Sequence, residues 1–379
     1  MQICAVICEL NPMHVGHKFL FDSAKKELKP DTVLALMSGN FVQRGEPAIL
    51  NEYYRSEIAL NSGADIALEL PTVYSCASAN VFAEGAVKVL KNLGCVNALA
   101  MGAEDANPNA FKVLADIQLN GKESFSSEIK DEMKKGLSYI KAMSEVTARR
   151  VSLKVVDAKE FLSKPNNVLA LEYYKAALKA NFPIKFYFVK RESGIKSEEI
   201  RSDLTSNLSS LAPGSKELIL EKFKDYYVRK DELSALALNA LQKSSLNDIA
   251  SCPDCGEGLE NRIKEAAHLS TNLYEFYEKM ASSRYTLSRI KRISMQRMLG
   301  IKKDNQTSSY NYARVLGIKK IAVDFLSIAS GKIIVSSNDE SIFNGKLPKE
   351  YEIEKEANRL YSLLTHDASC TFYKKLLTI

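Results

Sequence analysis

The chain has 379 residues, of which 46% are hydrophobic and 26% are charged, and its formal net charge is +6 at pH 7. This composition is typical of a globular protein long enough for two domains, and it excludes a disordered chain. No apolar run reaches the roughly 20 residues that cross a bilayer, and the start "MQICAVICEL" lacks the basic leader of a signal peptide. We therefore expect no membrane partner and a cytoplasmic location.

Seven cysteines are scattered along the chain, several of them inside apolar runs. An odd number of cysteines in a long chain indicates reduced, mostly buried thiols rather than a disulfide framework. Cys252 and Cys255 form "CPDC", which has the spacing of half a zinc knuckle or of a redox pair. No second pair and no nearby histidine complete a set of four ligands, so we expect a loop without metal; a metal or redox role is the alternative.

The first 200 or so residues alternate short apolar runs with helical patterns. Strands are expected at residues 2–8, 32–37, 66–70, 96–102 and 184–190, and helices at 16–28, 51–62 and 79–92. This alternation predicts an α/β fold, a Rossmann-like doubly wound parallel sheet with flanking helices.

The character of the chain changes after about residue 205. Residues 215–300 show helical periodicity, and only "KKIAVDFL" and "KIIVSS", near 319–336, look like strands. We therefore expect a catalytic domain over residues 1–205 and a second, mainly helical domain over residues 206–379.

Two of the four histidines lie in "NPMHVGH", residues 11–17, directly after the first expected strand. Ligands bind at the carboxyl ends of strands in open parallel sheets. Gly16 carries no Cβ to hold a phosphate away from the helix N–H groups, and His14 and His17 lie on one side of the first turn, where both can donate to a phosphate chain. A turn in which both histidines merely cap the helix is the alternative; we expect phosphate binding.

This stretch resembles the HxGH form of the signature shared by nucleotidyltransferases and class I aminoacyl-tRNA synthetases. More specific blocks are similar to the tRNA(Met) cytidine acetate ligase family. They are "SGNFVQRGEPA" within residues 37–94, "MGAE" at 101–104, "PNNVLALEYYKA" at 165–176, "GLENRIKEAA" at 258–267 and "RYTLSRIKR" at 284–292. The resemblance spans most of the chain.

The resemblance implies an ATP-dependent ligase that activates acetate as acetyl-adenylate and transfers the acetyl group to N4 of the wobble cytidine of elongator tRNA(Met). It implies ATP with Mg²⁺, acetate and that tRNA as partners, and His14 and His17 as catalytic residues. The ATP-binding residues that it implies are Ile7, Cys8, Glu9, Leu10, Asn11, Pro12, Met13, His14, Val15, Gly16, His17, Lys18, Phe19, Leu20, Gly102, Asn166 and Arg191.

Three of these residues lie far from the histidines in the sequence. Gly102 ends an expected strand, where adenosine can approach the backbone; an ordinary loop glycine is the alternative. Asn166 begins an expected helix, so that its amide either caps the helix or contacts the nucleotide. Arg191 follows the last strand of this region, where a guanidinium can pair with phosphate oxygens or remain solvated.

One position departs from the family pattern. The segment after Arg191 has the ending that the family pattern predicts at Ser197, Ile200 and Arg201. Glu198, however, occupies the position where the pattern has a threonine hydroxyl. A carboxylate repels a triphosphate unless it turns to solvent or helps to hold Mg²⁺.

Residues 282–303 contain seven lysines and arginines and no acidic residue. We expect Arg289, Arg292 and Gln296 to share one exposed helix face, with Tyr285 stacking on a base, so that the segment neutralises tRNA phosphates. A solvated surface is the alternative. The substrate and tRNA contacts expected on this basis, and on that of the "SGNFVQRGEPA" block, are Ser38, Asn40, Gln43, Arg44, Arg284, Arg289 and Arg292. For the four residues of that block, a purely structural loop is the alternative.

Two other functions remain open from the sequence. A small-molecule adenylyltransferase explains the HxGH loop but not the long helical region with its basic segment. A non-catalytic RNA-binding adaptor with a retained nucleotide fold is compatible with the Glu198 departure.

Overall fold

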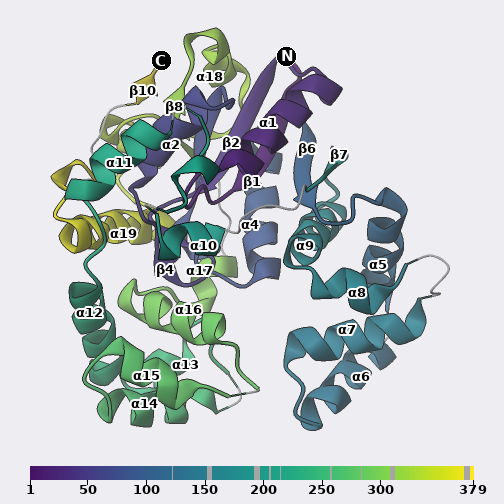
Figure 1. Ribbon diagram of the computed structural model, residues 1–379, viewed down its shortest axis with the longest axis vertical. Helices are drawn as coiled ribbons and strands as arrows, with labels where there is room; N and C mark the ends of the chain where they lie inside the picture. The colour runs from purple at the N-terminus through teal and green to yellow at the C-terminus, as the bar shows by residue number, and fades with distance from the viewer. Residues whose placement is uncertain are drawn as a thin grey trace.

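The computed structural model describes residues 1–379 except 122, 152–155, 192–196, 205, 214, 257, 283, 308–311 and 371–375. A mainly parallel sheet runs through its centre (Figure 1), in the order β10-β8-β5-β2-β1-β6-β7, with β9 paired to β8. Its strands are β1 (Ile3–Cys8), β2 (Thr32–Ser38), β5 (Ile66–Leu70), β6 (Val96–Ala103), β7 (Lys185–Lys190), β8 (Tyr312–Ile318), β9 (Lys332–Ile334) and β10 (Leu377–Thr378). Only the β5–β8 pairing is antiparallel among the pairings described in this sheet. A separate hairpin joins β3 (Phe41–Val42) to β4 (Glu46–Pro47).

The first part of the chain supplies helices that flank the sheet, together with a peripheral pair that has a small core of its own. They are α1 (Val15–Leu28), α2 (Glu52–Asn61), α3 (Thr72–Ser75), α4 (Ala79–Asn92), α5 (Pro108–Asn120), α6 (Glu123–Lys134), α7 (Tyr139–Arg150), α8 (Ala158–Ser163), α9 (Pro165–Lys179) and α10 (Ser197–Ser202). The expected strands and helices of this region are confirmed, with ends that agree within one residue.

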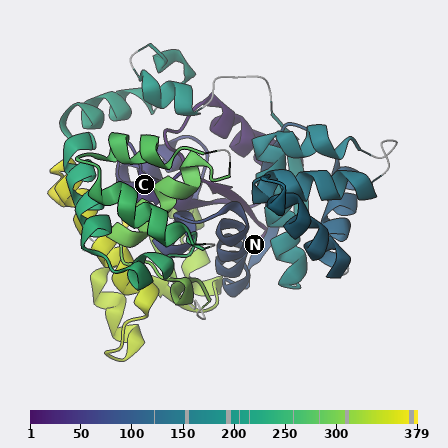
Figure 2. The same ribbon diagram turned by 90° about the horizontal axis from the view of Figure 1, so that it is seen from below.

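The later helices are α11 (Lys216–Asp225), α12 (Lys230–Lys243), α13 (Leu246–Ala250), α14 (Leu259–His268), α15 (Leu273–Met280), α16 (Leu287–Met298), α17 (Lys303–Thr307), α18 (Phe325–Ile328) and α19 (Lys349–Thr365). Helices α12 to α16 pack on one another as a group. Figures 1 and 2 both show this group and the group from α5 to α8 on opposite sides of the molecule.

The sheet has a separate core on each face, because successive side chains of a strand point in opposite directions. In β1, Ile3 and Ile7 pack in the cluster that includes α4 and α9, whereas Cys4 and Val6 pack in the cluster that includes α1 and α2. Both faces of β1 are thus buried, as in other parallel sheets that carry helices on both sides. The doubly wound α/β class expected from the sequence is confirmed.

The end of the chain differs from the expectation. "KKIAVDFL" is not a strand: it forms a 3-10 turn (Lys320–Ala322) followed by α18, whereas the neighbouring strand β8 was not expected. A buried arginine, Arg314, interrupts the apolar pattern of β8 and hides it from a reading of periodicity. "KIIVSS" does contain a strand, β9. Since β8 and β10 pair within the sheet of the first part, the sheet itself does not end at the expected boundary near residue 205.

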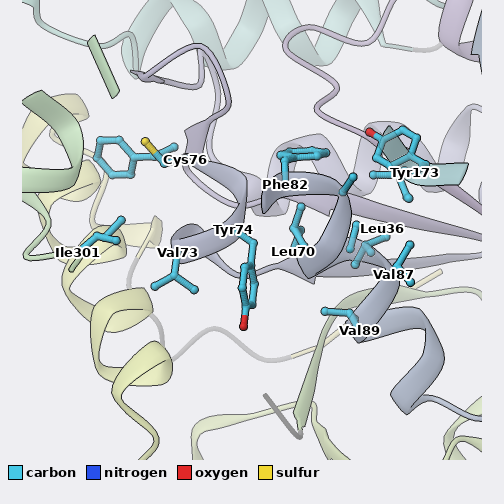
Figure 3. Packing of buried hydrophobic residues seen from close by; sticks show 14 of the residues in the cluster. Leu36, Leu70, Val73, Tyr74, Cys76, Phe82, Val87, Val89, Tyr173 and Ile301 are labelled. Atoms are coloured by element: carbon cyan, nitrogen blue, oxygen red, sulfur yellow. The ribbon is translucent and has the colours of Figure 1, made fainter. Parts of the chain in front are cut away.

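The helical group contacts the first part of the chain through α3 and the β3–β4 hairpin. Figure 3 shows Ile301, which follows α16, beside Val73 of α3, and both belong to the larger core cluster. Gly45, in the turn of the hairpin, has a φ of +75°, and a Cβ there would lie 2.3 Å from the backbone nitrogen of Arg292 in α16. The hairpin therefore rests directly on the helix. Among the described residues, no helix combines the length and hydropathy that a membrane span requires.

Candidate active site

His14 and His17 together cap the amino end of α1. His14 is the N-cap residue: its Nδ1 accepts from the Gly16 N–H at 3.1 Å, and the Nδ1 of His17 accepts from the His14 N–H at 3.3 Å. The two ring centroids are 4.0 Å apart. The capping interpretation is therefore confirmed, and it also fixes the orientation of both rings.

The cap determines which ring nitrogen carries the proton. A nitrogen that accepts from an N–H is unprotonated, so in the neutral rings the hydrogen lies on Nε2. Burial, with a smaller contribution from the charge of Arg191, lowers the pKa of His14 to about 4. Burial, His14 and Arg191 hold the pKa of His17 well below its usual value. Both rings are therefore uncharged at neutral pH and can donate through Nε2.

Gly16 is required by the histidine beside it. A Cβ at this position would lie 2.9 Å from Cε1 of the His14 ring and 3.0 Å from its Nδ1. The Gly16 N–H is donated to His14, so the helix N–H groups that a phosphate could approach here do not include that of Gly16. Lys18, whose charge was expected to help, pairs with Asp22 at 2.8 Å on the exposed side of α1.

The loop before α1 is held by distant parts of the chain. His14 forms an isolated antiparallel bridge with Leu211, and the N–H of Ala212 donates to the carbonyl of Met13 at 3.4 Å. Arg201 of α10 donates to the carbonyl of Asn11 at 2.8 Å. Of the expected ATP-binding residues, those buried here are Ile7, Cys8, Leu10, Asn11, Pro12, Met13 and His14, whereas Val15, Gly16 and Phe19 are exposed and Glu9, His17, Lys18 and Leu20 are half-buried.

Arg191, Asn166 and Gly102 come together at the ends of β6 and β7. Nη1 of Arg191 donates to Oδ1 of Asn166 at 2.8 Å. A Cβ on Gly102 would lie 3.5 Å from Cγ of Arg191, which is ordinary contact, so the protein itself does not require a glycine there. Arg191 also contributes to the lowered pKa values of His14 and His17, so its charge lies close to the histidine pair.

A buried arginine, which the sequence analysis did not identify, donates hydrogen bonds to the carboxyl ends of two strands. Arg55 of α2 donates to three backbone carbonyls at the ends of β1 and β2: Glu9 at 2.7 Å, Ser38 at 2.9 Å and Gly39 at 2.5 Å. Its side chain is almost completely buried. The sequence gives no signal for this role, because α2 contains several other polar residues and spacing does not reveal which carbonyls the arginine reaches.

Two residues expected to contact substrate are instead part of the core. Ser38 and Asn40 are completely buried. Asn40 accepts from the Glu52 N–H at 2.9 Å and donates to Asn358 at 2.8 Å, so its amide joins α2 to α19. The backbone N–H of Gln43 donates to Glu9 at 2.8 Å.

Arg44 is exposed and pairs with Glu198, the residue that departs from the family pattern. Nη1 of Arg44 lies 3.3 Å from Oε2 of Glu198, and both side chains are more than half exposed. The carboxylate therefore turns to solvent and to a cation. Its neighbour Ser197 contacts Nε2 of His14 through its hydroxyl at 3.0 Å. The segment 192–196, which lies between Arg191 and this turn, is outside the described residues.

Several residues of the basic segment, 282–303, are buried where the sequence analysis expected an exposed face. Gln296 is completely buried, and Tyr285 is buried with Arg289 over its ring, so neither the exposed face nor the base-stacking role expected of them is correct. Arg292 pairs with Asp254 at 2.9 Å, and the Nε of Arg289 donates to the Asp254 carbonyl at 2.8 Å.

Other cations of the segment also contact the protein. Lys291 lies 3.8 Å from Glu46, Lys303 donates to the carbonyl of Ala250 at 2.7 Å, and Arg297 donates to Ser244. Arg284 and Lys302 are exposed, and the Arg284 guanidinium lies 5.4 Å from the centre of the Tyr285 ring. Many of the cations in residues 282–303 therefore contact other parts of the protein.

All seven cysteines are free thiols and, except for the half-buried Cys95, they are buried. Burial raises the pKa of Cys252 to about 12 and that of Cys255 to about 11, so "CPDC" holds protonated thiols in the core. Among the described residues, the one group that could hold a metal ion is Glu52, Glu69 and Glu354, which is buried.

Comparisons with known proteins identify the family of the chain. The model of the HIGH Nucleotidyl Transferase family matches residues 1–375. The tRNA(Met) cytidine acetate ligase of Alkaliphilus metalliredigens is 32% identical over 96% of this chain and 94% of its own length, and that of Thermosipho africanus is 33% identical over 92% and 87%. The crystal structure of Thermotoga maritima TmcAL bound with alpha-thio ATP is 28% identical, covers 100% of both chains and has a TM-score of 0.91. The chain therefore belongs to the tRNA(Met) cytidine acetate ligase family of HIGH nucleotidyl transferases.

Proposed function

We propose that this protein uses ATP to activate acetate as acetyl-adenylate and then transfers the acetyl group to N4 of the wobble cytidine of elongator tRNA(Met). The observation that carries the proposal is the pair of uncharged imidazoles that cap the start of α1, with Arg191 close by. The names of the relatives and the ATP analogue bound to the related TmcAL support it.

In the first half-reaction, an acetate oxygen attacks the α-phosphorus of ATP, the bond to the β-phosphate oxygen breaks, and pyrophosphate leaves. Negative charge then shifts onto the leaving phosphates. His14 and His17 donate through Nε2 to these oxygens, and Arg191 supplies a full positive charge. Because the capping bonds hold both rings before ATP arrives, little reorganisation accompanies the reaction.

Ser197 extends this set of donors. Before ATP binds, the Ser197 hydroxyl accepts the Nε2 hydrogen of His14 at 3.0 Å; in the complex that hydrogen turns to a phosphate oxygen, and the Ser197 hydroxyl can donate to a second one. Glu198 does not oppose ATP in this arrangement, because Arg44 neutralises it at the surface.

Among the described residues, those around the histidine pair include no group of side chains that could hold a metal ion. The group able to bind a metal among the described side chains is Glu52, Glu69 and Glu354, and Arg314 already contacts two of these carboxylates. A Mg²⁺ ion that accompanies ATP would therefore take its oxygen ligands mainly from the phosphates and water.

In the second half-reaction, the exocyclic amine of cytidine attacks the acetyl carbonyl and AMP leaves. This amine is a weak nucleophile, so the enzyme has to position it and exclude water. The wobble base has to leave the anticodon stack to reach the site. We propose that Arg284, Arg289 and Lys302 contact tRNA phosphates, and that Arg292 supports this surface through Asp254. The free thiols of the chain fit a reducing, cytoplasmic location.

Two assays test the proposed function. Exchange of labelled pyrophosphate into ATP is expected to require acetate, and nucleosides of methionine tRNA are expected to contain N4-acetylcytidine after incubation with protein, ATP and acetate. Exchange that requires a phosphorylated metabolite instead of acetate would indicate a small-molecule adenylyltransferase. Binding of tRNA without any exchange would indicate an adaptor.

A further inference from the structure

We propose that Glu104 is a positioning residue that sets the orientation of Arg191 through the amide of Asn166. The proposal rests on the function proposed above, in which Arg191 contacts the phosphates of ATP. Glu104 lies just beyond the end of β6, Asn166 is in the first turn of α9, and Arg191 directly follows β7. The three side chains form a chain of hydrogen bonds across three elements.

Glu104 determines which way the Asn166 amide faces. Oε1 of Glu104 accepts from Nδ2 of Asn166 at 2.6 Å, so that Oδ1 of the same amide faces Nη1 of Arg191 at 2.8 Å. A carboxylate only accepts hydrogen bonds and a guanidinium only donates them, so a single amide orientation satisfies both neighbours. The reversed amide would point an N–H₂ at the guanidinium and an oxygen at the carboxylate.

Glu104 is itself held by the start of α9. This helix has no side-chain cap of its own, and the Glu104 carboxylate accepts from the N–H of Asn167 at 2.9 Å and from that of Asn166 at 3.4 Å. A carboxylate at the amino end of a helix is stabilised by the free N–H groups and the helix dipole. The position of the carboxylate, and hence of Arg191, is therefore tied to the helix.

The adjacent pair of residues offers a matched control. Oδ2 of Asp105 accepts from Nδ2 of Asn167 at 2.8 Å, and Lys164 pairs with Asp105 at 2.9 Å. Asp105 and Asn167 thus repeat the carboxylate-to-amide contact one residue further along, but this second contact leads to Lys164 and not to Arg191. Both contacts connect the end of β6 to α9, but only the contact of Glu104 with Asn166 continues to Arg191.

The experiment compares Glu104→Gln with Asp105→Asn in acetate-dependent pyrophosphate exchange. In Glu104→Gln, the new amide can present an N–H to Asn166, so that Asn166 turns its N–H₂ toward Arg191 and displaces the guanidinium. We expect KM for ATP to rise about tenfold, the effect of losing one hydrogen bond to a charged group. KM for acetate is expected to stay unchanged, and Asp105→Asn is expected to leave KM for ATP unchanged. Thermal unfolding of each variant reports the stability.

The relay is tested further in an Asn166→Ala background, where Glu104→Gln is expected to add no further rise in KM. An equal rise for Glu104→Gln and Asp105→Asn, or a Glu104→Gln effect that persists without the Asn166 amide, would overturn the proposal. An unchanged KM in Glu104→Gln, together with a raised KM in Arg191→Ala, would overturn the positioning role alone. If Arg191→Ala leaves KM for ATP unchanged, the proposed ATP site itself is wrong.

Discussion

Nη1 of Arg314 in β8 lies 2.8 Å from Oε1 of Glu52 in α2, and both side chains are at most 5% exposed. The same nitrogen lies 2.6 Å from Oε2 of Glu69 in β5. Glu354 of α19 completes a group of three buried carboxylates around one guanidinium. One positive charge cannot balance three negative charges in a dry interior, so the group has to bind protons as the protein folds.

Protein stability is therefore expected to fall as the pH rises from the acidic range to about 8. Burial and the neighbouring carboxylate raise the pKa of Glu52 to about 8, and burial raises the pKa of Glu69 to about 8. A carboxyl group whose pKa is higher in the folded state stabilises the fold fully at low pH and loses this contribution as the pH rises through the folded value. Each proton involved contributes a slope of about 1.4 kcal/mol per pH unit between the two pKa values. Urea unfolding between about pH 5 and 8 measures this slope, and Glu69→Gln should flatten it. An equally steep slope in the variant would contradict the assignment.

The imidazoles of His14 and His17 are expected not to titrate near neutral pH. Burial lowers the pKa of His14 to about 4 and holds that of His17 well below its usual value, so both remain uncharged between about pH 5.5 and 8. Their stabilising contribution is fully present above the unfolded pKa and is lost as the pH falls from that value through the lower folded pKa. NMR titration of the ring protons, with signals assigned from His14→Ala and His17→Ala, checks this directly. A transition near pH 6.5 for either ring would show that it is solvated.

Replacing His14 by alanine is expected to reduce acetyl-adenylate formation about 10²- to 10³-fold, which is typical for the loss of one preorganised donor to developing charge. Affinity for tRNA should change little. His366→Ala is the matched control, because His366 is an exposed histidine that pairs with Glu232 at 3.1 Å, at the end of α19. Mass spectrometry of the adenylate and a tRNA binding assay measure the two quantities. A parallel loss of both would mean that His14→Ala disturbs the fold.

Gly45→Ala is expected to destabilise the protein by more than about 2 kcal/mol, because it combines an unfavourable positive φ with a collision against the backbone of α16. Gly300→Ala provides the comparison. Gly300 has a similar φ of +71°, but no atom lies within 4 Å of the position of its Cβ. The free energy of unfolding of Gly300→Ala should fall by only about 1 kcal/mol. Denaturant unfolding of both variants separates backbone strain from contact, and equal losses would show that the hairpin can move away from the helix.

Arg292→Ala is expected to lower the free energy of unfolding by about 3 kcal/mol or more, since it leaves the buried Asp254 without its cation. Lys302→Ala should instead leave stability within about 0.5 kcal/mol and reduce the salt slope of tRNA binding by about one. Unfolding curves and tRNA titrations at several salt concentrations measure these effects. A normal stability for Arg292→Ala, combined with weaker tRNA binding, would restore Arg292 as a direct RNA contact.

The sequence predicted the sheet of the first part because parallel strands are buried on both faces and appear as unbroken apolar runs. The sequence did not predict β8, because Arg314 interrupts its apolar run. The guanidinium of Arg314 donates to Glu52 of α2 and to Glu69 of β5. The histidine loop could be located from the sequence because it directly follows a predicted strand.

The partners of the site residues were not predictable from spacing. Asn40 contacts Asn358, Arg55 reaches the ends of two strands, and Arg292 is held by Asp254. Each of these contacts depends on the packing of elements that lie far apart in the chain. A pattern of charges along one helix shows which face is polar, but not whether another element covers that face.

The position of Arg314 near the end of the chain has a consequence during synthesis. A nascent protein that has emerged from the ribosome only as far as residue 205 already contains Glu52 and Glu69, but not the guanidinium that they surround in the finished molecule. The open edge of β5 has no strand beside it at that stage. The amino-terminal half therefore lacks one cation of its core and one edge of its sheet until the last sixth or so of the chain has been translated.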